Sequence, residues 1–194
     1  MEKNSKHNGF EYVDLGLPTG LKWATCNVGA KNPEERGMYF QWGETEDCSN
    51  KECNLGTYKF CTNLKMTKYT TADGLETLEP EDDAAHIHMS GDWRMPTREE
   101  IQELIDNTKS EWTKLNGVDG REFTGPNGNS IFIPASGRRY GSSTRSVGSI
   151  CHLWSSSLNT SYPDYGARLY SYSGDIHMNY DIRYFGFSVR GVFK

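Results

Sequence analysis

The C-terminal part of this sequence lacks three residue types that are common in the rest of it. Residues 123–193 contain no Lys, Glu or Gln over 71 positions, whereas residues 1–122 contain 27 of them. Ser (13 residues), Tyr (7), Gly, Asn and Arg take their place. A β region rich in Gly and Ser needs few long charged side chains. The composition therefore favours short strands and turns in this part of the chain.

The same residue types also build binding surfaces. Tyr offers a large contact area at low entropic cost, while Ser and Asn offer adaptable hydrogen bonds. Arg adds a planar group that carries several hydrogen-bond donors. Composition alone leaves two interpretations of residues 123–193 open, a plain β region and a recognition surface.

Length and aromatic content indicate one folded domain. A chain of 194 residues lies within the size range of a single compact unit. Aromatic residues make up 12 % of the chain, which argues against disorder because disordered chains lack such side chains. Residues 1–9 are polar, so we expect them to form a disordered tail, with a single domain over residues 10–194.

Charge and hydropathy argue against two classes of partner. Residues 1–122 carry 14 Lys/Arg against 23 Asp/Glu, and residues 123–193 carry six Arg against three Asp, with no basic run. This lacks the clustered basic charge of a nucleic-acid-binding protein. The sequence has no long apolar stretch, so it predicts no direct membrane insertion and no signal peptide.

Local patterns predict several elements. A hairpin is expected at residues 10–25, because Pro18 and Gly20 suit a tight turn between two apolar segments. Thr97 and Glu100 form a capping box, which predicts a helix over residues 97–107. Residues 44–81 are expected to be a long irregular loop, and a short helix begins near residue 82. Strands are expected at residues 130–134, 153–156, 167–172, 176–182 and 187–192.

Two of these strands can be divided into faces, because successive side chains on a strand point to opposite sides. The apolar side chains predict an inward face made of Leu169, Ile176, Met178 and Ile182. The polar and aromatic ones predict an outward face made of Arg168, Tyr170, Tyr172, His177, Asn179 and Asp181.

Short motifs in a fixed order resemble a known family. They are Tyr12–Pro18, Leu21–Ala30, Tyr39–Phe40 before Trp42–Glu44, Trp93–Thr97, Asn127–Phe132, Trp154–Ser157 and Ser188–Arg190. Together they span about residues 11–192 and resemble the Fibrobacter succinogenes major paralogous domain family. The chain departs from the family at Gly191, where a Pro usually follows the Ser-Val-Arg triplet.

The resemblance implies an α+β, C-type-lectin-like fold shared with the formylglycine-generating enzyme. Such a domain has short twisted antiparallel sheets, one or two helices, long irregular loops and chain ends that lie together. Its ligand-binding region would lie at about residues 138–187. Family members occur in surface proteins of gut bacteria and in phage-encoded proteins, which suggests the cell surface or a virion.

The chain is also similar to variable proteins that are diversified by retroelements. Mutation of the adenines in an AAC codon gives codons that end in C, which cannot encode Lys, Glu, Gln, Met or Trp. Residues 123–193 contain none of the first three, and Trp154 and Met178 would be fixed positions. Diversification would therefore explain the composition as well as a plain β region does.

Catalytic and metal-binding motifs are weak. Cys48, Cys53, Cys61, His86 and His88 lack the spacing of a zinc site, so we predict no metal and no cofactor. Cys151 and His152 are adjacent, and neighbours on a strand point apart, which argues against a nucleophile and base. An odd number of cysteines leaves at least one thiol unpaired, and their pairing is open.

These observations predict a non-enzymatic binding protein that contacts a protein or glycan ligand, as an adhesin or a receptor-recognition domain does. Two alternatives are a structural module of a surface or fimbria assembly and an enzyme related to the formylglycine-generating class. The predicted contact residues are Tyr140, Arg145, His152, Tyr162, Asp164, Tyr165, Arg168, Tyr170, Tyr172, Asp175, His177, Asn179, Tyr180, Asp181, Arg183 and Tyr184.

Overall fold

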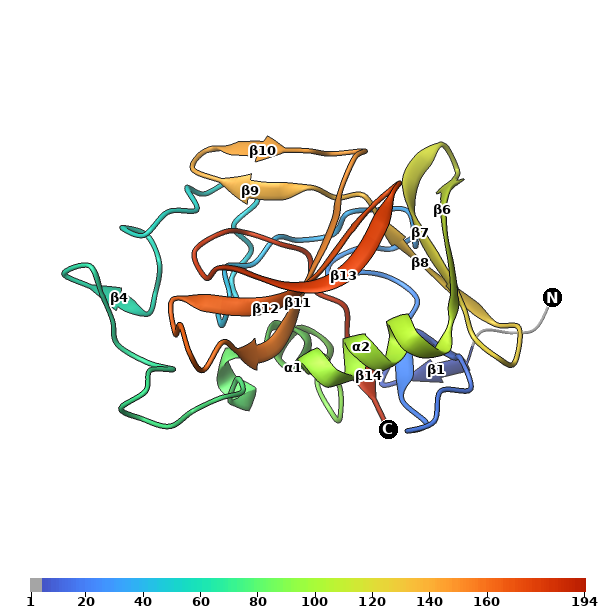
Figure 1. Cartoon of the computed structure of the whole chain (residues 1–194), viewed down its shortest axis with the longest axis horizontal. Coiled ribbons are helices and arrows are strands. Elements are labelled where there is room, and N and C mark those ends of the chain that lie inside the picture. The colour runs from blue at the N-terminus through green and yellow to red at the C-terminus, as the bar shows by residue number, and fades with distance from the viewer. Residues whose placement is uncertain (1–4) are drawn as a thin grey trace.

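A computed structural model describes residues 5–194 (Figure 1). This part of the chain consists mostly of small antiparallel sheets with two α-helices, which agrees with the α+β class. The first sheet has the strand order β1-β2-β3-β14, so the first and last strands lie in one sheet. Its strands are β1 (Ser5–His7), β2 (Phe10–Asp14), β3 (Lys22–Ala24) and β14 (Val192–Phe193).

The hairpin predicted at residues 10–25 is confirmed. β2 pairs with β3, and the amide of Gly20 donates to the carbonyl of Leu17 at 2.9 Å. Gly20 has a φ of 74°, a conformation that suits glycine. The disordered tail is wrong for residues 5–9, because β1 pairs with β2, while residues 1–4 lie outside the described part. The strand predicted at residues 187–192 is wrong except at Val192: β14 covers Val192–Phe193 and pairs with β3, while Phe187 and Ser188 form isolated bridges to Phe40 and Leu153.

The helices begin where the capping residues predict. In α2 (Arg98–Asn107) the Thr97 hydroxyl accepts from the Glu100 amide, and the Glu100 carboxylate accepts from the Thr97 amide. Glu100 also receives two hydrogen bonds from Arg94, at 2.6 and 2.7 Å. The 3₁₀ turn η1 (Pro80–Asp82) leads into α1 (Ala84–Met89), whose first turn is capped by Asp83. A capping carboxylate stabilises a helix start by satisfying free amides.

A second sheet has the strand order β6-β7-β8, with β8 at the predicted position. Its strands are β6 (Lys109–Leu115), β7 (Val118–Thr124) and β8 (Ser130–Pro134). Arg121 of β7 donates to the Ser171 hydroxyl at 3.0 Å and to the Tyr172 carbonyl at 2.6 Å. These bonds attach the sheet to the C-terminal part of the chain.

The third sheet carries most of the predicted contact residues. It contains β11 (Cys151–Leu158), β12 (Tyr165–Tyr172) and β13 (Asp175–Ile182) in this order. Leu169 pairs with Met178, and both pack in one core cluster with Ile101 and Leu104 of α2. The predicted inward face is therefore confirmed, and α2 covers it.

The opposite face of this sheet carries the predicted outward residues. Arg168 pairs with Asn179, Tyr170 with His177, and Asp181 lies on the same side, since it forms an ion pair with Arg168 at 2.9 Å. The hairpin of β9 (Arg138–Tyr140) and β10 (Ser143–Arg145) lies toward this side (Figure 1). No local pattern predicted this hairpin.

The long loop at residues 44–81 is irregular, as predicted, apart from the small hairpin of β4 (Cys61–Thr62) and β5 (Lys65–Met66). Arg183 holds this loop from the other end of the chain. Its guanidinium donates to the Tyr58 hydroxyl at 2.7 Å and to the carbonyls of Lys68 and Tyr69 at 3.0 and 3.2 Å. The side chain is fully buried among the rings of Trp42, Tyr58, Phe60 and Tyr69.

Candidate recognition surface

The sixteen predicted contact residues differ in exposure. Eight are exposed: Tyr140, Arg145, Tyr162, Asp164, Tyr165, Tyr172, Asp175 and Asn179. Five are half-buried: Tyr170, His177, Tyr180, Asp181 and Tyr184. Three are buried: His152, Arg168 and Arg183. Only the first two groups can touch a partner at the surface.

The three buried residues correct the sequence prediction. His152 is stacked on Phe187 with ring centroids 4.5 Å apart, and burial holds its pKa well below the ordinary value. Arg168 lies under the ring of Tyr170, at 4.7 Å from its centroid, and is paired with Asp181. Arg183 belongs to the aromatic cage beneath residues 58–69. All three support the surface from below and do not form it.

Tyr180 is a further correction, because it lies on the wrong side of the sheet. It pairs with Ala167, on the face that carries Leu169 and Met178. The guanidinium of Arg98, from α2, lies 5.7 Å from its ring centroid. Tyr180 therefore belongs to the side that α2 covers.

Aromatic contacts join the remaining residues into one surface. Arg145 lies over the ring of Tyr140, and Tyr140 meets Phe185 with centroids 5.0 Å apart. Phe185 meets Tyr184 at 5.5 Å and the buried Phe187 at 6.4 Å. This links the β9–β10 hairpin to the segment after β13.

The chain of contacts continues onto the third sheet. From Phe187 it passes through His152 to Tyr170, whose ring centroid lies 5.5 Å from that of the histidine. Tyr170 then meets Tyr172 at 5.9 Å and His177 at 5.3 Å. We call the surface defined by these contacts the tyrosine face. Its members are Arg138, Tyr140, Arg145, Tyr170, Tyr172, Asp175, His177, Asn179, Asp181, Tyr184 and Phe185.

Tyr162 and Asp164 lie on the loop between β11 and β12, and Tyr165 is the first residue of β12. Tyr165 pairs with Ile182, on the face of the sheet that carries Leu169 and Met178, so like Tyr180 it corrects the prediction. Burial raises the pKa of Tyr184, with smaller effects from Tyr140, Tyr165 and Asp181. Tyr162 and Tyr165 are exposed, at 68 % and 37 %.

A groove of about 430 Å³ opens at the other end of the tyrosine face. Its walls are the rings of Tyr170 and Tyr172, the side chain of Trp112 from β6, and residues 148–150. Aromatic walls with nearby backbone polar groups are typical of a binding groove. Trp112 is half-buried at this groove.

Sequence reasoning missed two members of the tyrosine face. Arg138 lies 5.2 Å from the ring centroid of Phe185, and both are half-buried. Their positions next to predicted contact residues could have indicated them: Phe185 follows Tyr184 in the sequence, and Arg138 pairs with Arg145 in the hairpin. The pairing of Arg138 with Arg145 depends on the β9–β10 hairpin, which no local pattern predicts.

Tyrosine hydroxyls behave differently in the two parts of the chain. Tyr39, Tyr58 and Tyr69 are buried, and their hydroxyls donate to the Ser136 carbonyl, to the Trp42 carbonyl at 2.7 Å and to the Asp82 carboxylate at 2.7 Å. Within residues 5–194, none of the seven tyrosine hydroxyls after residue 122 has a hydrogen-bond partner. The tyrosine hydroxyls of the C-terminal part therefore bind no other group of the described chain.

Of the residues considered for catalysis and metal binding, Cys48 and Cys53 lie together, with their sulfurs 2.8 Å apart. Cys151 donates to the Ile133 carbonyl in the α2-side cluster, while His152 stacks on the other face, so the two lie apart as predicted. His86 and His88 each contact a backbone carbonyl. In the described part of the chain, the one group of three metal-ligand side chains is Glu79, Glu81 and Asp82, which Lys68 pairs with.

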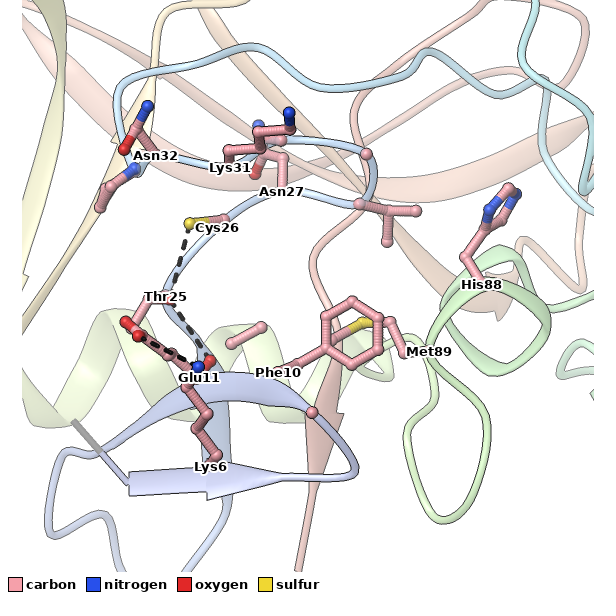
Figure 2. Close-up of a pocket in the computed structure, with 16 residues that line it drawn as sticks. Lys6, Phe10, Glu11, Thr25, Cys26, Asn27, Lys31, Asn32, His88 and Met89 are labelled. Atoms are coloured by element: carbon pink, nitrogen blue, oxygen red, sulfur yellow. Dashed lines mark hydrogen bonds and ion pairs between the residues drawn. The ribbon is translucent and has the colours of Figure 1, made fainter.

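A second concavity, of about 590 Å³, lies on another part of the molecule (Figure 2). Phe10 of β2, residues 24–33 and the end of α1 at Met89 line it. The Thr25 hydroxyl donates to the Glu11 carbonyl at 3.3 Å and lies 3.5 Å from the Cys26 sulfur, as the dashed lines of Figure 2 show. None of the sixteen predicted contact residues lines this cavity.

Comparisons with protein-family models, with curated proteins and with solved structures found no match to this chain. No helix among residues 5–194 has both the length and the apolar character that a membrane span needs.

Proposed function

We propose that this chain is a non-enzymatic binding protein and that the tyrosine face contacts its ligand. The observation that carries the proposal is that the hydroxyls of Tyr140, Tyr170, Tyr172 and Tyr184 have no partner among the described residues, on side chains that reach solvent. Of the eight exposed large apolar side chains in the described residues, five lie between residues 140 and 172. Exposed Tyr beside Arg, Asn and Asp is the composition of known recognition surfaces.

We further propose that the domain is C-type-lectin-like and belongs with the family that its motifs resemble. This proposal is supported by the small antiparallel sheets, the two helices and the long irregular loop. It is also supported by the first sheet, which contains both the first and the last strand of the chain. Retroelement diversification of the surface remains part of the proposal. It is supported by the two residues that diversification would keep fixed, since Trp154 is fully buried and Met178 packs against the core.

The binding role is tested with a variant that removes three side chains of the tyrosine face. Purified wild-type chain selects ligands from a random peptide library and from a printed glycan array. Tyr140→Ala, Tyr172→Ala and Asn179→Ala together should weaken binding to every selected probe by at least about 30-fold, the loss expected for hot-spot residues. Titration calorimetry or biolayer interferometry gives the affinities.

The matched control removes exposed apolar side chains elsewhere. Leu64→Ala and Ile87→Ala together take away side chains that are 79 % and 48 % exposed and lie outside the tyrosine face. This control should bind the selected probes as the wild type does. Unchanged binding by the triple variant would overturn the proposed function, and so would an equal loss in the control.

A further inference from the structure

Two buried thiols lie almost within bonding distance. The Sγ atoms of Cys48 and Cys53 are 2.8 Å apart, and the two residues are 2 % and 0 % exposed. A disulfide bond is about 2.05 Å long, so a shift of less than about 1 Å would join them. The other three cysteines are in different places: Cys26 and Cys61 are half-buried, and Cys151 donates to a backbone carbonyl.

These two sulfurs are closely packed on all sides that the structure describes. With Tyr39 they form a small separate cluster. Gly186 lies directly against them, since a Cβ at that position would come 2.7 Å from the Cys48 sulfur and 3.2 Å from the Cys53 sulfur. In the described part of the chain, no group of metal-ligand side chains includes either cysteine.

The segment that carries the pair is attached to the β9–β10 hairpin. The Cys53 amide donates to the Gly141 carbonyl at 3.0 Å, and the Gly141 amide donates back at 2.9 Å. Arg139 of β9 donates to the Lys51 carbonyl at 2.7 Å. Residues 48–53 therefore form a platform under the hairpin that presents Tyr140.

The two thiols differ in acidity, in a way that suits bond formation. The hydrogen bond between them, and then the nearby Arg139 guanidinium, lower the pKa of Cys53. The same hydrogen bond, together with burial, raises the pKa of Cys48. Cys53 is therefore the more acidic thiol of the folded pair, and the thiolate is the attacking form in disulfide exchange.

We propose that Cys48 and Cys53 form an intrachain disulfide that fixes residues 48–53 beneath β9. The oxidant is a small disulfide such as oxidised glutathione. One of the two cysteine thiolates attacks a sulfur of the reagent and releases one glutathione thiolate, and the other cysteine then attacks the mixed disulfide and releases the second. Two electrons pass from the cysteine pair to the reagent, and the two protons end on the released thiols. Because both thiols are buried, exchange takes place while residues 48–53 are detached from β9 or before folding is complete.

The test uses the full chain treated with oxidised glutathione, then denatured and alkylated with N-ethylmaleimide. Intact mass and peptide mapping should show three alkylated cysteines, Cys26, Cys61 and Cys151, and one linked pair, Cys48 with Cys53. Cys26→Ser should keep the linked pair, and Cys53→Ser should abolish it. Five alkylated cysteines, or a link of Cys48 to Cys61, would overturn the proposal. The experiment needs no ligand, so its result is independent of the binding role.

A second measurement asks whether the bond fixes the platform. Adding dithiothreitol should lower the melting temperature of the oxidised wild type by about 4–8 °C, because a short closed loop restricts the unfolded chain. The double variant Cys48→Ser, Cys53→Ser should show no such change. An equal shift in both proteins, or no shift in either, would contradict the fixing role.

Discussion

The tyrosines of residues 5–122 are mostly buried, whereas those of residues 123–193 are all at least partly exposed. Three of the four in the first region, Tyr39, Tyr58 and Tyr69, are buried and donate hydrogen bonds inside the molecule. All seven in the second region keep some exposure, and their hydroxyls have no partner within the described residues. A buried Tyr needs a partner for its hydroxyl, whereas an exposed one keeps the hydroxyl for water or a ligand.

The arginines of the second region are mostly buried, in contrast to its tyrosines. Of the six Arg after residue 122, four are buried: Arg139, Arg168, Arg183 and Arg190. Arg190 is fully buried and donates to Asn27 and to the carbonyls of Ala24, Thr25 and Phe132. Composition predicted these arginines to be part of a binding surface, but they connect distant loops inside the molecule. The tyrosines form the exposed surface.

The largest change in stability is expected when the buried Arg183 side chain loses its hydrogen bonds. Arg183→Met should lower the free energy of unfolding by about 3–5 kcal/mol, because it leaves the Tyr58 hydroxyl and several buried carbonyls without their donor. Urea denaturation measures the change. A variant that loses binding and keeps wild-type stability would return Arg183 to the set of contact residues.

A smaller effect is expected at Asp82, which the buried Tyr69 contacts. Burial alone would raise the pKa of this carboxyl, but hydrogen bonds from Lys59, Lys68 and Tyr69 outweigh it and hold the pKa below the ordinary value. Asp82→Asn should cost about 1.5–3 kcal/mol near pH 7, since it weakens charge-assisted bonds.

The pH dependence follows from the sign of this shift. A lowered pKa gives stability that is fully present above the unfolded value, about 3.9 for Asp, and is lost as pH falls through the folded value. The gap between wild type and Asp82→Asn should therefore narrow below about pH 4. Burial raises the pKa of the neighbouring Asp83, and taking the difference between the two proteins cancels that contribution. A gap that stays constant to pH 2 would contradict the assignment.

The smallest effect on stability is expected at the tyrosine face. Tyr172→Phe removes a hydroxyl that has no partner in the described structure, so the free energy of unfolding should change by less than about 0.5 kcal/mol. Thermal and urea unfolding measure this. A loss above about 1 kcal/mol would show that the hydroxyl has a structural partner.

Local signals in the sequence predicted much of the fold. Pro18 and Gly20 marked the first hairpin, and Thr97 with Glu100 marked the start of α2, because turns and caps depend on nearby residues. Alternation along residues 167–182 separated Leu169 from Tyr170 correctly, since strand side chains alternate.

Other features depend on residues far apart in the chain and could not be predicted. Arg183 is buried because Tyr58 and Lys68 lie beside it in space, more than 110 positions away in the sequence. His152 is covered by Phe187, which returns over β11 from the end of the chain. The β9–β10 hairpin shows no apolar alternation in its sequence. It is held to residues 51–53 by backbone hydrogen bonds and by the Arg139 side chain, and not by an apolar face.

Two triple variants test the contrast between the tyrosine sets most directly. One carries Tyr39→Phe, Tyr58→Phe and Tyr69→Phe, and the other carries Tyr140→Phe, Tyr172→Phe and Tyr184→Phe. Urea unfolding should show a loss of about 3–6 kcal/mol for the first, from three lost buried hydrogen bonds, and of less than about 1 kcal/mol for the second. Equal losses in the two variants would contradict the claim that the C-terminal tyrosines are displayed and the N-terminal ones are structural.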